Sequence, residues 1–193
     1  MRVHSLEAIV RDGLCVGCGL CASIAGHDRV EMRWTKEGRL RPAAKERLDR
    51  PTLKRINQTC PGLSVEGMDP MIAGPGASFD DAFGYAQAMW RGWASDPEVR
   101  FKAATGGGLS ALAIYLLQTK QVDFVAHIRS PEGTPLRNVP HVSTSREDVI
   151  AGMGSRYAPV APLLNFVQHL EKKRPFAVIA KPCDISAIRN LSK

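Results

Sequence analysis

The sequence lacks any long hydrophobic run. Its longest apolar stretch, Leu109–Leu117, is interrupted by Ser110 and is much shorter than the roughly 18 apolar residues that a membrane-spanning helix requires. Residues 1–11 carry charges throughout and contain no apolar core of a secretory signal. We therefore expect a cytoplasmic protein without a membrane span.

Aromatic residues are also scarce, at 6% of the 193 residues, and they do not alternate with basic ones. The formal net charge is +7, yet basic residues cluster only within 45–55 and 172–174. Surfaces that bind single-stranded nucleic acid combine a basic groove with aromatic side chains that stack on bases, so nucleic acid is not the expected partner. A basic surface instead suits an acidic redox partner protein or an anionic cofactor.

A disulfide framework is a further absence. The five cysteines are odd in number, and three of them fall within seven residues. Such a pattern in a reducing compartment is typical of metal binding rather than of disulfides.

The order of elements predicts an α+β (mixed α/β) protein in two parts. We expect a cysteine-containing lobe over 1–67, a linker rich in glycine, proline and aspartate over 68–84, and an α/β domain over 85–193. In the lobe, a helix is predicted near 43–58, with a kink or break at Pro51.

The second part alternates helices, loops and strands. Residues 85–93 fit a strand or a short helix, and Pro97 opens a helix capped by Ser95 or Asp96. Further helices are predicted over 109–119 and 159–173, strands over 122–128 and 176–180, and a new helix after Lys181. Because one strand and a starting helix rarely finish a sheet, we expect a chain truncated at its C-terminus.

The strongest motif is Cys15-x-x-Cys18-x-x-Cys21. This spacing lets three thiolates of one loop reach three irons of a cubane cluster, and Gly17 and Gly19 allow the backbone to wrap closely. A simple two-cluster ferredoxin would have its next cysteine at position 25, which is Ala25 here. Cys60, followed by Pro61, is the expected remote fourth ligand of a single 4Fe–4S cluster.

Other interpretations of the cysteines stay open. Zinc also binds four thiolates, although its sites usually consist of two cysteine pairs. A 3Fe cluster, a fourth ligand other than Cys60, or a chance group of structural cysteines are further alternatives. His27 lies close in sequence and is a candidate ligand, but it also fits an exposed or hydrogen-bonding residue.

A glycine run, Thr105-Gly106-Gly107-Gly108-Leu109-Ser110, precedes the predicted apolar helix. Glycines at a helix N-terminus expose N–H groups and the positive end of the helix dipole, which together suit a phosphate or a flavin edge. The run matches neither the dinucleotide fingerprint nor the P-loop. A flexible turn before a core helix explains it as well.

Three segments resemble a known family in combination. The run from Trp93 to Gly107 (WASDPEVRFKAATGG) is similar to the start of the coenzyme F-420 hydrogenase/dehydrogenase beta subunit family. Gly154-Ser155-Arg156-Tyr157 resembles that family's Gly-Ser-Lys-Tyr segment, and Lys181-Pro182-Cys183-Asp184-Ile185 resembles its Pro-Cys segment at a strand end. The N-terminal cysteine loop also fits.

The resemblance implies an iron–sulfur flavoprotein oxidoreductase. Members pass electrons between a 4Fe–4S cluster and FAD, and from FAD as hydride to the deazaflavin coenzyme F-420 or another conjugated acceptor. A hydrogenase- or dehydrogenase-type subunit is then the expected electron-transfer partner. The implied flavin-binding residues are Thr105, Gly106, Gly107, Gly108, Ser110, Ser155 and Tyr157, and the implied residues near the chemistry are Lys181, as a cation favouring the anionic reduced flavin, and Cys183.

The chain departs from the family at several positions. Thr105 stands where serine is usual and keeps the hydroxyl, and Arg156 stands where lysine is common. Cys183 fits a second cluster ligand, a flavin-lining residue or an inert buried thiol. Members are about twice as long, so two alternatives stay open: a non-catalytic electron-transfer or docking protein with a cluster but no flavin, and a zinc-stabilised structural or nucleic-acid-binding module.

Overall fold

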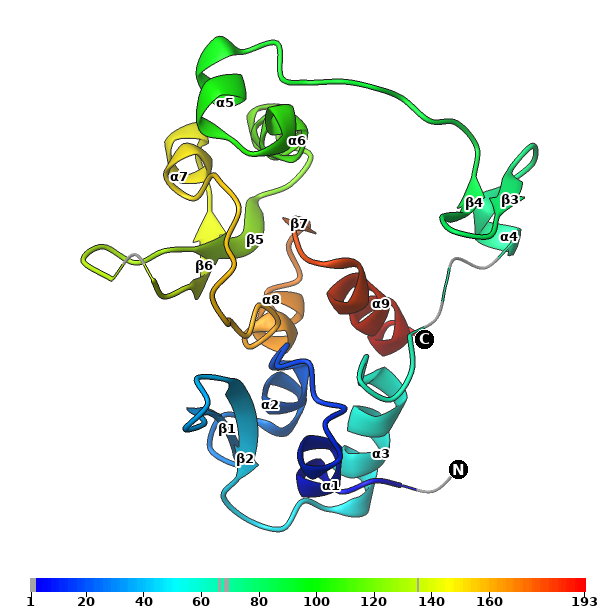
Figure 1. The fold of residues 1–193 in the computed structure, drawn as a ribbon, viewed down its shortest axis with the longest axis vertical. Helices are drawn as coiled ribbons and strands as arrows, with labels where there is room; N and C mark the ends of the chain where they lie inside the picture. Colours follow the sequence, from blue (N-terminus) through cyan, green and yellow to red (C-terminus); the bar gives the residue numbers. More distant parts are fainter. Residues whose placement is uncertain (1–2, 66, 68–69, 135) are drawn as a thin grey trace.

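The computed structural model describes residues 3–65, 67, 70–134 and 136–193, and within them the protein is a mixed α+β fold with small sheets. Its N-terminal lobe lies at one end of the molecule in Figure 1. That lobe consists of α1 (Leu6–Arg11), α2 (Leu20–Ala25), β1 (Val30–Trp34), β2 (Leu40–Ala44) and α3 (Arg50–Thr59).

Between α2 and α3, the chain of this lobe forms an antiparallel hairpin. Strands β1 and β2 pair from Val30 opposite Ala44 to Trp34 opposite Leu40. The charged segment 35–39 forms the turn between them, closed by a 2.7 Å hydrogen bond from the Thr35 N–H to the Arg39 carbonyl. Residues 43 and 44, which the sequence pattern assigns to a helix, therefore pair with β1 as part of β2.

The predicted helix over 43–58 is wrong at its N-terminal end. Residues 43 and 44 belong to β2, and α3 begins only at Arg50. The Asp49 carboxylate caps α3 by accepting a hydrogen bond from the Thr52 N–H, and Pro51 lies in the first turn. Proline is tolerated there because the first N–H groups of a helix have no intrahelical partner, so Pro51 helps to start the helix and does not kink it.

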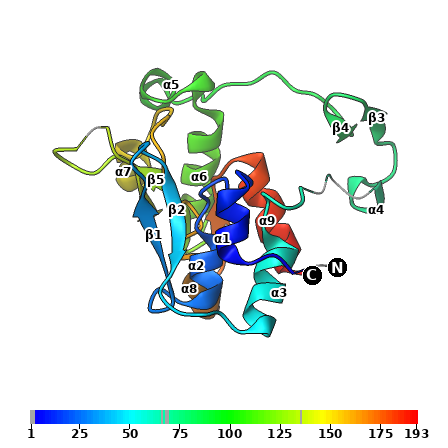
Figure 2. The ribbon, with the colours of Figure 1, turned by 60° about the horizontal axis from the view of Figure 1, so that its bottom comes forward.

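The segment after α3 runs along one side of the molecule, apart from the rest (Figures 1 and 2). It contains α4 (Pro70–Ala73) and a small hairpin of β3 (Ser78–Asp80) and β4 (Gly84–Ala86). The predicted linker thus includes short regular elements, although its residues 68 and 69 lie outside the described part of the chain. Of the stretch 85–93, only residues 85 and 86 form a strand.

The second part contains a three-stranded sheet in the order β6-β5-β7. The central strand β5 (Phe124–Arg129) pairs antiparallel with β6 (Val139–Ser143) and parallel with β7 (Phe176–Val178). The remaining elements are α5 (Pro97–Lys102), the 3-10 turn η1 (Thr105–Gly107), α6 (Gly108–Gln118), α7 (Arg146–Ala151), α8 (Phe166–Glu171) and α9 (Pro182–Leu191).

Most predicted elements of this part are confirmed. Asp96 caps α5, with Pro97 in its first turn, and α6 matches the predicted apolar helix to within one residue at each end. The helix predicted over 159–173 is wrong for its first half, since residues 159–165 are irregular and α8 begins at Phe166. The predicted strand over 176–180 ends at Val178.

The two parts share a hydrophobic core. Cys18 and Leu20 of the cysteine loop and α2 pack with Leu163, Phe166 and Ala187. A 2.9 Å hydrogen bond from the Leu163 N–H to the Cys18 carbonyl adds a polar contact. The irregular segment 159–165 therefore holds the cysteine loop against the second part. Within the described residues, no helix is long and apolar enough to cross a membrane.

Candidate functional site

The four cysteines of the predicted cluster line one pocket. Cys15, Cys18 and Cys21 come from the loop between α1 and α2 and from the first turn of α2, while Cys60 directly follows α3. The rest of the lining is largely apolar and includes Leu6, Ile9, Leu20, Pro42, Ile56 and Pro61. The tertiary fold thus brings Cys60 to the loop from which it is separated by about forty residues of sequence.

Glycines allow the backbone around this pocket to pack closely. Gly17 and Gly19 have φ angles of 77° and 83°, a region that side chains disfavour. A Cβ at Gly17 would lie 2.8 Å from the Leu40 carbonyl oxygen. Gly62, just after Cys60-Pro61, is more restricted still, because its Cβ would overlap the Leu14 carbonyl. Gly62 therefore lets the Cys60 segment approach the cysteine loop.

Cys18 is buried, the other three cysteines of the pocket are half-buried, and the thiols lie close enough to influence one another. Burial, and secondarily the neighbouring Asp184, Cys60 and Cys15, raises the pKa of Cys18 to about 12. Burial and the other three thiols raise the pKa of Cys21 well above its ordinary value, and burial also raises the pKa of Cys60. Four thiols that repel one another as anions need a bound cation or cluster to be held together as thiolates.

Backbone donors point at these sulfurs. The Leu20 N–H lowers the pKa of Cys18, and the N–H groups of Gly62 and Leu63 lower that of Cys60, each opposing the effect of burial. Hydrogen bonds to cluster-ligating sulfurs are a feature of iron–sulfur sites. In chemistry and burial, the donor set therefore fits a thiolate-bound metal group.

The pocket does not show a finished coordination geometry. Among the residues that the structure describes, no group of three or more histidine, cysteine, aspartate or glutamate side chains is arranged to hold a metal ion. His27, the alternative ligand, lies within hydrogen-bonding distance of the Leu164 carbonyl, with 3.1 Å between its Nε2 and the oxygen. It is not part of the described pocket lining.

A large cavity of about 620 Å³ adjoins the cysteine pocket. The two share Val16 and Gly17 of the cysteine loop as a common wall. The cavity has a cationic lining with Arg39, Arg41, Arg156 and Lys181, and its other walls include Ile128, Ile179 and the segment 157–160. Its size falls in the range of small-molecule and cofactor sites.

A second cavity, of about 490 Å³, continues from the first. Ile128, Arg156 and Ile179 line both. The second cavity ends at the N-terminus of α6, where Thr105, Gly108 and Ser110 form its wall, and Ser155 lies there too. The free N–H groups and dipole of this helix end favour an anionic group.

The glycine run adopts an unusual turn. Thr105, Gly106 and Gly107 have consecutive φ angles of 53°, 69° and 78°, a conformation that is costly for a β-branched residue such as threonine. A Cβ on Gly107 would lie 3.0 Å from the Val99 carbonyl oxygen, and one on Gly106 would lie 3.1 Å from the Trp93 side chain. Gly106 and Gly107 thus pack against the protein, whereas Thr105, Gly108 and Ser110 face the cavity.

Of the remaining predicted residues, two line the larger cavity and the third lines neither cavity as described. Tyr157, which is 94% exposed, and Lys181 line the larger one. Cys183 lies in the first turn of α9 and is half-buried, but the described lining of neither cavity includes it. Its role stays a prediction.

Several residues that line the cavities had no role predicted from the sequence. Asp184 and Arg156 stood in the quoted motifs without an assigned role, and both line the larger cavity. Arg39 and Arg41 come from the hairpin of the N-terminal lobe, whose position only the fold reveals. His127 lines the second cavity, with its Nε2 2.7 Å from the Ser143 hydroxyl.

Fold and site together define an α+β protein in which a buried cysteine pocket adjoins a cationic cavity large enough for a cofactor. Residues 89–168 match the family described as coenzyme F420 hydrogenase/dehydrogenase, beta subunit N-term. Over this segment the chain is similar to that family, which confirms the resemblance drawn from the sequence motifs.

Curated relatives match about half of the chain. The coenzyme F420 hydrogenase subunit beta of Methanococcus voltae is 31% identical over 103 residues, which are 52% of this chain and 36% of that protein. The F420-dependent formate dehydrogenase 1 subunit beta of Methanococcus maripaludis is 33% identical over 101 residues, covering 52% of this chain and 26% of that protein. The matched region thus spans about a quarter to a third of these relatives.

A solved structure is similar over a comparable region. It is a chain of the F420-reducing NiFe hydrogenase complex from Methanosarcina barkeri, with a TM-score of 0.46 and 24% sequence identity. The match covers 50% of this chain and 34% of that chain.

Proposed function

We propose that the chain is an electron-transfer subunit of an oxidoreductase that holds one 4Fe–4S cluster and FAD in adjoining sites. The observation that carries this proposal is the shared wall of Val16 and Gly17 between the cysteine pocket and the cationic cavity. When bound, a cluster carries electrons singly and a flavin exchanges them singly or in pairs as hydride. Sites with a common wall suit electron passage between the two.

The chain's residues divide the work. Cys15, Cys18, Cys21 and Cys60 would hold the cluster, while apolar neighbours such as Ile9 and Ile56 exclude water from it. The α6 N-terminus with Thr105 and Ser110, together with Arg156, suits the phosphates of FAD in the second cavity. The flavin ring would then lie in the larger cavity, between Arg156 and the cysteine loop.

The relatives suggest the acceptor and the partner. The matched hydrogenase and formate dehydrogenase beta subunits are named for coenzyme F420. We therefore propose a deazaflavin or another conjugated hydride acceptor as the substrate, and a hydrogenase- or dehydrogenase-type subunit as the redox partner. The cationic cavity also suits an anionic substrate.

Metal and flavin analysis of the chain tests this function. After anaerobic purification we expect about four irons per chain, the broad visible absorbance of an iron–sulfur protein, and bound FAD. Iron without FAD, including after incubation with added FAD, would instead indicate an electron-transfer or docking protein without flavin chemistry. Zinc in place of iron would overturn the proposal in favour of a zinc-stabilised module.

A further inference from the structure

Asp184 is a buried carboxylate that no donor among the described residues meets at normal hydrogen-bond geometry. It lies in the first turn of α9, its side chain has no solvent exposure, and neither carboxylate oxygen has a hydrogen-bond partner among the described residues. Burial raises its pKa, while the charge of Lys181 and the backbone N–H of Lys181 oppose that effect. A buried polar group left without partners costs free energy that a native structure normally avoids.

The nearest cation is a weak substitute for a hydrogen bond. The Lys181 ammonium lies 3.8 Å from Asp184 Oδ2, and the lysine side chain is 57% exposed. A long side chain held by one such contact can be joined or displaced by a ligand at little cost. The dipole at the α9 N-terminus and the Lys181 backbone N–H also favour the negative charge, but neither oxygen reaches a hydrogen-bond partner at normal geometry among the described residues.

The place of Asp184 indicates where the missing donor comes from. Asp184 belongs to the wall of the cavity of about 620 Å³ that adjoins the cysteine loop. Its negative charge helps to raise the pKa of Cys18. Arg39, Arg41, Arg156 and Lys181 line the same cavity, so a cationic ligand would be repelled. A neutral or anionic ligand with an N–H group would supply a donor to Asp184 and would not be repelled by the cationic lining.

We infer that Asp184 and Lys181 together recognise the cyclic-imide edge of the flavin ring, which rests on the proposed binding of FAD in this cavity. On that edge a carbonyl oxygen stands next to an N–H group, so it offers an acceptor and a donor side by side. Lys181 is the matching donor and Asp184 the matching acceptor, and the structure places them next to each other. The Asp184 carboxylate accepts a hydrogen bond from the imide N–H, and Lys181 donates to the adjacent carbonyl.

Binding of FAD and of 3-methyl-FAD to the flavin-free full chain tests this inference. The methyl group removes the imide N–H and leaves the rest of the ligand unchanged. Since a hydrogen bond to a charged group is involved, we expect methylation to weaken binding about tenfold or more. In Asp184→Leu this ratio should fall towards one, because leucine leaves no acceptor for the imide N–H.

Asp123→Leu is the matched control. Asp123 makes an ion pair with Arg174, 2.7 Å apart, and belongs to the lining of neither cavity as described, so this variant should keep the wild-type ratio. If the wild-type chain binds both flavins equally, or folded Asp184→Leu keeps the full ratio, the inference is wrong. A wild-type ratio near one overturns it even if Asp184→Leu does not fold. Failure to bind FAD at all would overturn the proposed function and this inference together.

Discussion

The cysteine pocket and the cationic cavity share a wall, yet they are built in opposite ways. The pocket combines four thiols with apolar side chains from residues 6–21 and 42–61, all within the first third of the chain. The cavity is lined by charged residues from three distant segments, 39–41, 156–162 and 179–184. The pocket is therefore a local, dry site suited to a metal group, and the cavity is a long-range assembly suited to an anionic ligand.

The largest expected effect comes from removing a thiol of the pocket. Cys18→Ala deletes a buried thiol that we propose as a cluster ligand, so iron content should fall from about four per chain to near zero. If the two sites are separate constructions, FAD should remain bound. Iron analysis and the visible spectrum after anaerobic reconstitution measure both.

Cys183→Ser is the control for this experiment, because Cys183 is not part of the described pocket lining. It should keep the cluster. Brown, iron-containing Cys18→Ala protein would contradict the ligand assignment.

The next-largest effect comes from changing the backbone packing of the pocket wall while all four cysteines stay in place. Gly62→Ala places a methyl group against the Leu14 carbonyl, and crowding of this kind costs about 1–3 kcal/mol. We expect lower stability in denaturant unfolding and partial loss of iron, because Cys60 is displaced from the loop. Gly92→Ala, which meets no atom within 4 Å, should change neither; equal effects of the two substitutions would refute the steric explanation.

The cavity side should respond to pH through His127. Burial, and secondarily His141, lowers the pKa of His127 to about 4, against about 6.5 in an unfolded chain. Above pH 6.5 both states are neutral there, whereas below it the unfolded state takes up a proton that the folded state resists. Stability therefore falls as the pH drops from about 6.5 to 4.

Thermal unfolding of the wild type and His127→Gln over this range measures the effect. The variant should lose less stability, while Arg129 and Asp148, which also act on His127 in opposite directions, remain in both proteins. Parallel pH profiles would show that His127 titrates normally.

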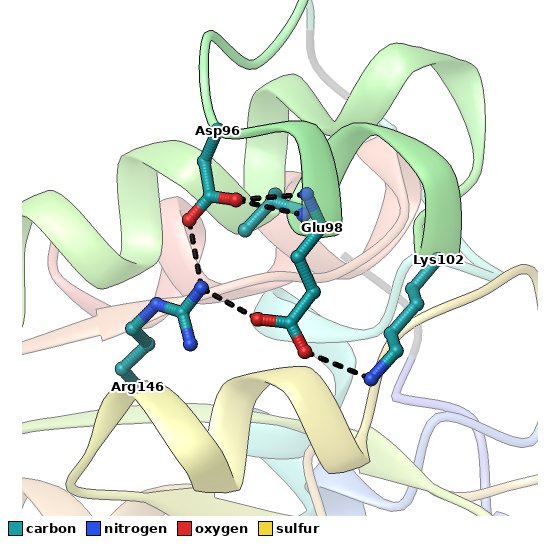
Figure 3. A network of polar contacts seen from close by, with 5 residues as sticks. Asp96, Glu98, Lys102 and Arg146 are labelled. Atoms are coloured by element: carbon teal, nitrogen blue, oxygen red, sulfur yellow. Dashed lines mark hydrogen bonds and ion pairs between the residues drawn. The ribbon is translucent and has the colours of Figure 1, made fainter.

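The smallest expected effect concerns the helix cap and the ion pairs of α5, the helix that precedes the glycine run. Figure 3 shows Arg146 of α7 between Asp96 and Glu98 of α5, at 2.7 and 2.8 Å. Asp96 also caps α5 through the N–H groups of Glu98 and Val99. Asp96→Ala removes both cap and ion pair, so its melting temperature should drop by a few degrees more than that of Arg146→Ala.

Lys102→Ala is the matched control, because it removes only a surface ion pair with Glu98. It should leave the melting temperature nearly unchanged. A drop as large as that of Asp96→Ala would show that charge, rather than helix capping, stabilises this corner.

Local sequence patterns predicted the elements whose formation depends on neighbouring residues. The cap at Asp96 with Pro97 and the apolar run of α6 each carry their cause within a few residues. Residues 43–44 and 159–165 were misassigned because distant contacts decide them. The first pair joins β1 in a ladder, and Leu163 of the second segment is bonded to Cys18 and buried in the shared core.

The sequence by itself determined the cysteine motif and the resemblance to the family, because thiol spacing and motif residues are properties of short segments. Only the tertiary structure decided that Cys60 reaches the loop, that the hairpin arginines and Lys181 line one cavity, and that the Asp184 carboxylate lies there without a hydrogen-bond partner among the described residues. The physical reason is that burial and electrostatic neighbourhood depend on packing between segments far apart in the chain, which residue spacing does not encode.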